Sequence, residues 1–199
     1  MNQIPPGLRG LFDDVQPARP TDRLFFAIFP DAAVAARIAE TGAALRATLG
    51  LRGAVHRADR LHVTLHHLGE YAGVPADVVA AAGVAAARVD LPSFALRFDQ
   101  AASFAGPARQ RPFVLRGGDG LAAVERLRAG LGRQLVVAGL GRLVERRYTP
   151  HLTLLYDERV VAAQAIEPVG WTAHDFVLVH SLLGRTEHRV LGRWALSAE

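Results

Sequence analysis

Apolar residues along this chain fall into short continuous runs that alternate with longer segments of helical spacing. Residues 24–29 form such a run and, with Arg23, predict a buried strand that ends at Pro30. Asp31 is a suitable cap for a helix that follows. The same spacing rules predict two further helices, one over 75–89 and one that begins after Gly120. They predict the remaining strands at 61–68, 94–98, 113–115, 151–156, 176–183 and 189–196.

This order of elements predicts an α+β fold. Strand, helix and strand follow one another from residue 23, and nearly the same order returns in the second half, so we expect two similar halves. We treat 23–199 as a single domain. Residues 1–22 contain four prolines and little periodicity, and they are predicted to form an extended or mobile N-terminal leader.

Composition narrows the classes of function. With no cysteine among its 199 residues, the chain has no disulfide, thiolate nucleophile or cysteine-ligated zinc. All 23 basic residues are arginine and the formal net charge is +4, which suits either genomic base composition or a phosphate-binding surface. We find no signal peptide and no apolar segment long enough to span a bilayer, so a soluble, cytoplasmic protein is expected.

Two distant segments carry nearly the same motif. His62 and Thr64 stand between apolar residues in the first, and His151 and Thr153 do so in the second. On a strand, a spacing of two places the imidazole and the hydroxyl on one face. One copy is a weak signal, because a single strand histidine is commonly a surface or core residue, but two copies point to a shared site.

Two imidazoles with two hydroxyls suit in-line displacement at a phosphate. One neutral histidine can remove a proton from the attacking oxygen, and a protonated one can donate a proton to the leaving oxygen. The ordinary pKa of histidine, about 6.5, allows both states near neutrality. We therefore take His62 and His151 as the catalytic pair, and Thr64 and Thr153 as ligands of the phosphoryl oxygens.

Five segments of the chain resemble the 2H phosphoesterase superfamily, and within it the RNA 2′,3′-cyclic phosphodiesterases, also called 2′-5′ RNA ligases. These segments are the opening strand at 23–28, the motif at 61–65 with Leu68-Gly69-Glu70 after it, the motif at 148–154, the late strand at 176–178 and the closing segment 193–196. The resemblance covers the chain from about Arg23 to its end. It implies a bilobal, pseudo-twofold fold of two antiparallel sheets with flanking helices, whose central cleft carries both His-x-Thr motifs.

The resemblance also implies a reaction. It is the hydrolysis of a 2′,3′-cyclic phosphate, on an RNA end or a nucleotide, to a 2′-phosphate without a metal ion or cofactor, with reversible 2′-5′ ligation as a second activity. For hydrolysis we assign His151 as the base for water and His62 as the acid for the departing 3′ oxygen. We expect no membrane and no obligate protein partner, and a monomer.

Aromatic side chains are candidates for binding the base of such a substrate, since bases stack on aromatic rings. Phe26 lies on the opening strand and Tyr156 lies just after the second motif. Members of the family often carry arginine at the position of Tyr156, so this ring departs from the pattern. The alternatives are that Phe26 belongs to the core and that Tyr156 is an ordinary surface residue.

Arginine side chains near the second motif are candidates for guiding an RNA backbone toward the site. Arg147 is the nearest of those that precede the motif. An ordinary solvated charge run is the alternative for the whole set, which consists of Arg109, Arg111, Arg142, Arg146 and Arg147.

Two other functions stay open, a metal-dependent phosphohydrolase and an RNA-binding module without catalysis. His66 and His67 extend the first motif. On a strand, however, His62 and His66 lie roughly 13 Å apart, too far to share one ion, so no metal site is assigned. The remaining histidines have no partner spacing and are interpreted as structural or surface residues: His56, His174, His180 and His188.

Overall fold

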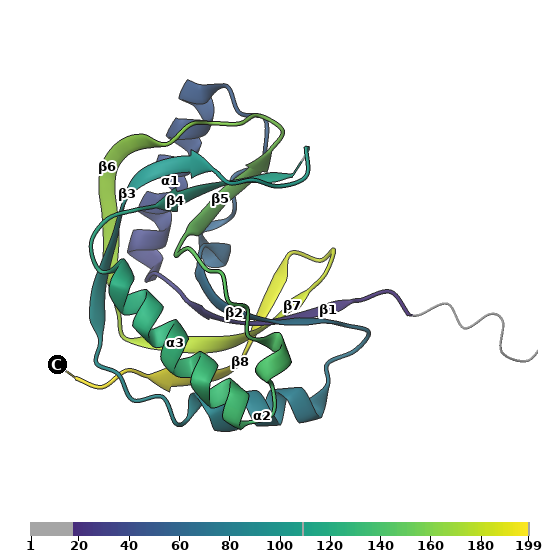
Figure 1. Cartoon of the computed structure of the whole chain (residues 1–199). Helices are drawn as coiled ribbons and strands as arrows, with labels where there is room; N and C mark the ends of the chain where they lie inside the picture. Colours follow the sequence, from purple (N-terminus) through teal and green to yellow (C-terminus); the bar gives the residue numbers. More distant parts are fainter. Residues whose placement is uncertain (1–17, 109, 199) are drawn as a thin grey trace, which may run out of the picture.

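The structure is a computed structural model that describes residues 18–108 and 110–198. Within these residues the chain forms two four-stranded antiparallel sheets and three α-helices (Figure 1). The predicted α+β fold of two antiparallel sheets with flanking helices is therefore confirmed. Most of the predicted leader, residues 1–17, lies outside the described residues, as does Arg109.

The first sheet brings together the two ends of the described chain. Its strand order is β2-β1-β7-β8, and neighbouring strands are antiparallel. The strand that carries Thr64 of the first motif, β2, lies at an edge of this sheet. The bounds are Asp22–Ile28 for β1, Val63–Tyr71 for β2, Asp175–Leu182 for β7 and Glu187–Ala195 for β8.

The second sheet is formed by the middle of the chain, and in Figure 1 it lies above the first. Its order is β5-β4-β3-β6, again antiparallel throughout. The strand that carries Thr153 of the second motif, β5, also lies at an edge. The bounds are Phe94–Ser103 for β3, Arg111–Arg116 for β4, Leu152–Asp157 for β5 and Gln164–Ala173 for β6.

The two halves repeat one unit, in which a strand leads through a helix to a motif strand. β1 leads through α1 (Ala32–Leu49) to β2, and β4 leads through α3 (Leu121–Val137) to β5. Each of these helices contacts the motif strand of the other sheet: α1 packs on β5 and β6, whereas α3 packs on β2, on β3 and on α2 (Ala76–Ala86). This exchange of helices ties the two sheets together.

Local sequence explains where α1 begins and ends. The Asp31 carboxylate accepts a hydrogen bond from the Val34 amide at 2.8 Å, as the capping prediction requires. Gly50 adopts a left-handed conformation with φ of 63° and ends the helix. Gly42 lets α1 approach β5 closely, because a Cβ there would lie 3.3 Å from Leu154 Cδ2.

Strand β6 was not predicted from the sequence. Pro168 and Gly170 interrupt its apolar pattern, and proline is normally excluded from the middle of a sheet. β6 lies at an edge and pairs only with β3, where a proline is tolerated. A Cβ on Gly170 would lie 2.2 Å from the Leu96 carbonyl oxygen, so the strands approach each other closely at this point.

The first sheet is apolar on both of its faces. One face contributes to the main core, in which Phe26 packs against Phe176 and Trp194. The other face carries a smaller cluster, formed by Phe25, Ala27, Val177 and Val179. Burial on both faces explains why β1 is a continuous apolar run instead of an alternating one.

The three α-helices of the described residues do not have the properties of a membrane-spanning helix. None of them has both the length and the apolar character that crossing a bilayer requires.

Candidate active site

Both motifs have the same local backbone structure. The strand predicted from residue 61 begins two residues later, so His62 directly precedes β2, just as His151 directly precedes β5. Thr64 and Thr153 are the second residues of their strands. The strand pairing then shifts after each threonine, and one additional residue is accommodated in each strand, Leu65 in β2 and Leu154 in β5. Such bulges bend a strand and change the direction of its side chains.

Each motif histidine makes the same hydrogen bond to the backbone. The Nδ1 atom of His62 lies 2.6 Å from the Arg60 carbonyl oxygen, and that of His151 lies 2.7 Å from the Thr149 carbonyl oxygen. Because a carbonyl oxygen only accepts, Nδ1 must carry the proton in both rings. The Nε2 atom of each neutral ring is therefore left as the acceptor for a substrate or water.

One cleft of about 240 Å³ receives residues from both motifs. Its lining includes His62 and Thr64 from the first half and His151 and Thr153 from the second. Among the described residues that line it there is no carboxylate, so the cleft suits an anionic ligand. The other lining residues are Arg23, Phe25, His56, Arg60, His67, Tyr156, Ser181 and His188.

Side chains of the second half hold the exposed edge of β2 in place. Tyr148, just before the second motif, donates its hydroxyl proton to the Thr64 carbonyl oxygen at 2.8 Å. Arg128 on α3 donates to the Leu65 carbonyl oxygen at 3.1 Å, and its guanidinium lies over the Tyr148 ring. Burial raises the pKa of Tyr148, so this residue remains a donor near neutral pH.

The edge of β5 is held in the same way by the first half. The His56 amide, in the connection between α1 and β2, donates to the Leu154 carbonyl oxygen at 2.7 Å. The Asp157 carboxylate accepts hydrogen bonds from the amides of Arg52 and Gly53 in the same connection. Each motif strand is therefore anchored by the opposite half, and this anchoring fixes the two motifs relative to each other.

The surroundings of the two histidines favour neutral imidazoles. The Phe25 ring stacks on His62 with a centroid distance of 4.9 Å, and the Phe104 ring meets His151 edge-on at the same distance. Burial lowers the pKa of His62 to about 3, with smaller lowering contributions from the nearby His188, His56 and Arg60 side chains. Burial also lowers the pKa of His151.

Comparison with known families identifies the family of this chain. Residues 30–184 match the model of the 2′-5′ RNA ligase superfamily. The chain belongs to this superfamily. Its members are 2H phosphoesterases, and membership supports the processing of phosphodiesters or cyclic phosphates as the general activity of the chain.

Solved structures of other proteins show the same fold. Escherichia coli LigT without ligand is 31% identical, with 90% of this chain and 99% of that chain covered and a TM-score of 0.66. A second structure, described as a phosphoesterase, is 30% identical, covers 89% and 99%, and has a TM-score of 0.67. A protein from Thermus thermophilus is 27% identical, covers 89% and 99%, and has a TM-score of 0.64. Comparison with curated proteins gives no match.

One of the two aromatic residues predicted to bind the base lines the cleft. Tyr156 lines it and is 48% exposed, and its ring meets His56 edge-on at 5.7 Å. Phe26, by contrast, is 0% exposed and belongs to the main core, so its predicted role in base stacking is wrong. The neighbouring Phe25 lines the cleft instead. Successive strand residues face opposite sides, and in a sheet with two apolar faces the sequence does not show which phenylalanine faces the ligand.

The described members of the predicted arginine set do not line this cleft. Arg147 is exposed, as are Arg142 and Arg146, and none of the three is among the described lining residues. Arg111 donates to the carbonyl oxygens of Ala108 and Glu158, so its guanidinium holds a turn of the chain.

Three cleft histidines lie outside the two motifs. His56 and His188 were interpreted from the sequence as structural or surface residues, and the structure places both in the lining of the cleft together with His67. His188 reaches it from β8, where it pairs with Ser181 across the sheet, and no local pattern indicates this. The described residues contain no group of three or more histidine, aspartate or glutamate side chains arranged to hold a metal ion.

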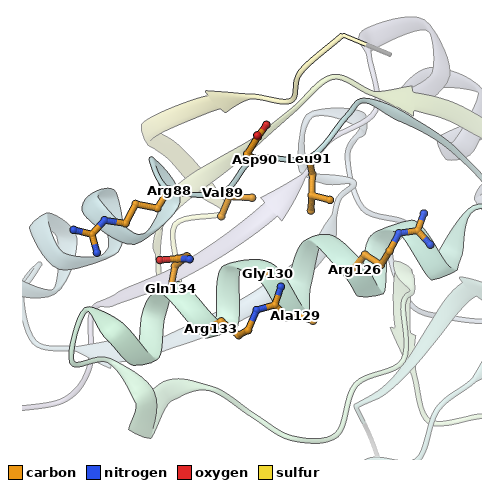
Figure 2. A pocket seen from close by; sticks show the side chains of 9 residues that line it. All are labelled: Arg88, Val89, Asp90, Leu91, Arg126, Ala129, Gly130, Arg133 and Gln134. Carbon is orange, nitrogen blue, oxygen red and sulfur yellow. The ribbon is translucent and has the colours of Figure 1, made fainter.

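A second hollow, of about 340 Å³, lies between the C-terminal end of α2 and one side of α3 (Figure 2). Arg126 and Arg133 contribute to it from α3, and Arg88 contributes from the segment after α2. It contains no residue of either motif and is separate from the cleft. Its lining residues are Arg88, Val89, Asp90, Leu91, Arg126, Ala129, Gly130, Arg133 and Gln134.

Proposed function

We propose that the protein hydrolyses 2′,3′-cyclic phosphates on RNA ends or nucleotides to 2′-phosphates, without a metal ion or cofactor, and that it catalyses 2′-5′ ligation in reverse. The observation that carries this proposal is the pair of histidines in one cleft, each with its Nδ1 proton bound to the backbone. E. coli LigT, which is 31% identical to this chain, forms crystals with phosphate and with 3′-AMP. Those complexes support a phosphate-centred site.

In the proposed reaction, the two histidines act on opposite sides of one phosphorus atom. The neutral Nε2 of His151 accepts a proton from water as the water oxygen forms a bond to phosphorus. The bond from phosphorus to the 3′ oxygen breaks, and protonated His62 donates its Nε2 proton to that oxygen. The product is a 2′-phosphate with a free 3′ hydroxyl.

The threonine hydroxyls stabilise the charge that develops during this displacement. Thr64 and Thr153 line the cleft beside their histidines, one from each half of the chain. In the proposed complex, the two hydroxyls donate hydrogen bonds to the two non-bridging phosphoryl oxygens. Hydrogen bonds to an anion are stronger than neutral ones, and they strengthen further as the charge on the oxygens increases.

The bound phosphate also promotes the protonation that His62 needs in order to act as the acid. In the free protein, burial lowers the pKa of His62 to about 3, so the ring is neutral at pH 7. A negative phosphate beside the ring favours the imidazolium form and raises its pKa. His62 therefore takes up its proton when the substrate binds.

The experiment that tests this proposal is incubation with a 2′,3′-cyclic mononucleotide in EDTA, followed by ³¹P NMR. Conversion to a 2′-phosphate supports the proposed function. Turnover only after addition of a divalent metal supports the metal-dependent alternative. Binding without turnover in either condition supports a catalytically silent RNA-binding module.

A further inference from the structure

One arginine of the cleft has hydrogen-bonding capacity that the described protein does not satisfy. The Nη2 atom of Arg60 lies 3.0 Å from Nε2 of His188. A guanidinium only donates, so His188 Nε2 is the acceptor and its remaining proton is on Nδ1. That Nδ1 atom and Nε of Arg60 are both buried and have no hydrogen-bond partner among the described residues. Buried donors without an acceptor are uncommon in proteins.

The charge of Arg60 is also uncompensated. Arg23, another cleft residue, forms an ion pair with Glu70 at 2.5 Å, and Arg57 pairs with Asp59 at 2.8 Å. Arg60 is half-buried and has no ion-pair partner within the described chain. Withdrawing a cation from water without a counter-ion costs free energy, and an anionic ligand would offset that cost.

Arg60 and His188 lie beside the catalytic residues but are not part of the two motifs. The His188 ring meets His62 edge-on, with 5.6 Å between the ring centroids. His188 is paired across the sheet with Ser181, which is itself paired with Arg23, so a row of polar residues crosses the first sheet beside the catalytic pair. The four motif residues already provide the acid, the base and the oxyanion donors for one phosphate. Arg60 and His188 are additional to that set.

We propose that Arg60 and His188 bind a second phosphate of the same substrate, on the 5′ side of the nucleoside that carries the reacting group. This inference rests on the proposed function. Rotation toward a bound phosphate gives an acceptor to both orphaned donors and a counter-ion to the guanidinium. The internucleotide phosphate of an RNA end and the 5′-phosphate of a free nucleotide both provide this chemistry. The protein therefore prefers either of them over a nucleoside with one phosphate.

The test is a calorimetric comparison of three stable ligands: adenosine 2′-monophosphate, adenosine 2′,5′-bisphosphate and a diadenosine dinucleotide ending in a 2′-phosphate. For the unmodified protein, at least one of the two-phosphate ligands should bind about tenfold to a hundredfold more tightly than the monophosphate, the range for hydrogen bonds to a charged group. Arg60→Gln should reduce this preference to near unity. Arg133→Gln removes the same charge from the second hollow and should preserve it.

The outcomes distinguish the possibilities. If both two-phosphate ligands bind more tightly than the monophosphate, any 5′-phosphate is sufficient. If only the dinucleotide binds more tightly, the site requires the internucleotide phosphate. Equal affinity of the unmodified protein for all three ligands would overturn the inference, as would an equal loss for all three in Arg60→Gln. Binding does not require turnover, so a phosphate preference without hydrolysis of cyclic substrates would contradict the proposed function and leave this inference standing.

Discussion

His62 and His151 make equivalent hydrogen bonds, because each Nδ1 atom donates to the carbonyl oxygen two residues earlier in the chain. Each ring also directly precedes an edge strand whose second residue is a threonine. The equivalence gives both histidines the same tautomer and the same available Nε2 atom. Acid and base can therefore exchange roles between hydrolysis and ligation, as reversal of a single displacement requires.

The pH dependence of kcat/KM follows from the lowered pKa values of the two histidines. The reaction needs one protonated and one neutral histidine. Because a ring with a lowered pKa keeps its additional proton only at lower pH, the fraction of enzyme in this active form declines as the pH rises. Because kcat/KM reports the free enzyme, it should fall about tenfold per unit on the alkaline side, with that limb beginning below 6.5. A constant kcat/KM between pH 5 and 8 would contradict this expectation.

Removing either motif hydroxyl should weaken catalysis without disturbing the fold. Thr64→Val and Thr153→Val keep the branched shape and delete one donor to the phosphoryl oxygens. Loss of a hydrogen bond to a charged group costs about 1.5–3 kcal/mol, so kcat/KM should fall roughly tenfold to a hundredfold. Thr64→Ser and Thr153→Ser keep the hydroxyl and serve as controls. Activity retained by both valine variants would show that the hydroxyls do not bind the reacting phosphate.

Tyr156 should contribute to the binding of an RNA end by stacking. Its ring lines the cleft and is 48% exposed. Stacking of a base on an aromatic ring contributes about 1–3 kcal/mol, so Tyr156→Ala should weaken binding roughly fivefold to a hundredfold, whereas Tyr156→Phe should not. The measurement is the affinity for an oligonucleotide with a terminal cyclic phosphate in the His151→Ala background. Unchanged affinity in Tyr156→Ala rejects stacking.

Tyr148 should act as a positioning residue for the first motif. Its hydroxyl donates to the Thr64 carbonyl oxygen, and this contact joins the two halves at the site. Tyr148→Phe should lower the free energy of unfolding by about 1 kcal/mol and should also lower kcat, with less effect on KM. Equilibrium denaturation and steady-state kinetics measure the two effects. A loss of stability with unchanged kcat would restrict Tyr148 to a structural role.

The sequence predicted the parts of the fold and site that depend on local pattern. Asp31 was identified as a cap because its position before an apolar helical repeat is a local signal, and the structure confirms it. The His-x-Thr motifs could be found because their polar residues interrupt apolar segments at regular spacing. Their meeting in one cleft was expected from the presence of two copies and from the resemblance to a family, not from either segment alone.

Other parts depended on tertiary structure that no local pattern records. Phe25 and Phe26 are adjacent and identical, so the sequence does not show which of them faces the cleft. The structure distinguishes them because they pack on opposite faces of the first sheet. His188 lies at the cleft because β8, near the C-terminal end of the chain, pairs with β7. Strand β6 was missed because Pro168 argues against a strand unless the strand lies at an edge.

The central claim is that His62 and His151 act together on one phosphate, and single substitution tests it most directly. The measurement is hydrolysis of a 2′,3′-cyclic nucleotide by His62→Ala and His151→Ala, with circular dichroism to verify the fold and with His174→Ala, an exposed histidine outside the cleft, as the matched control. Each cleft variant should lose about 10²–10⁴-fold in kcat/KM, the usual contribution of a general acid or base, while the control retains its activity. Full activity in either cleft variant would contradict the claim.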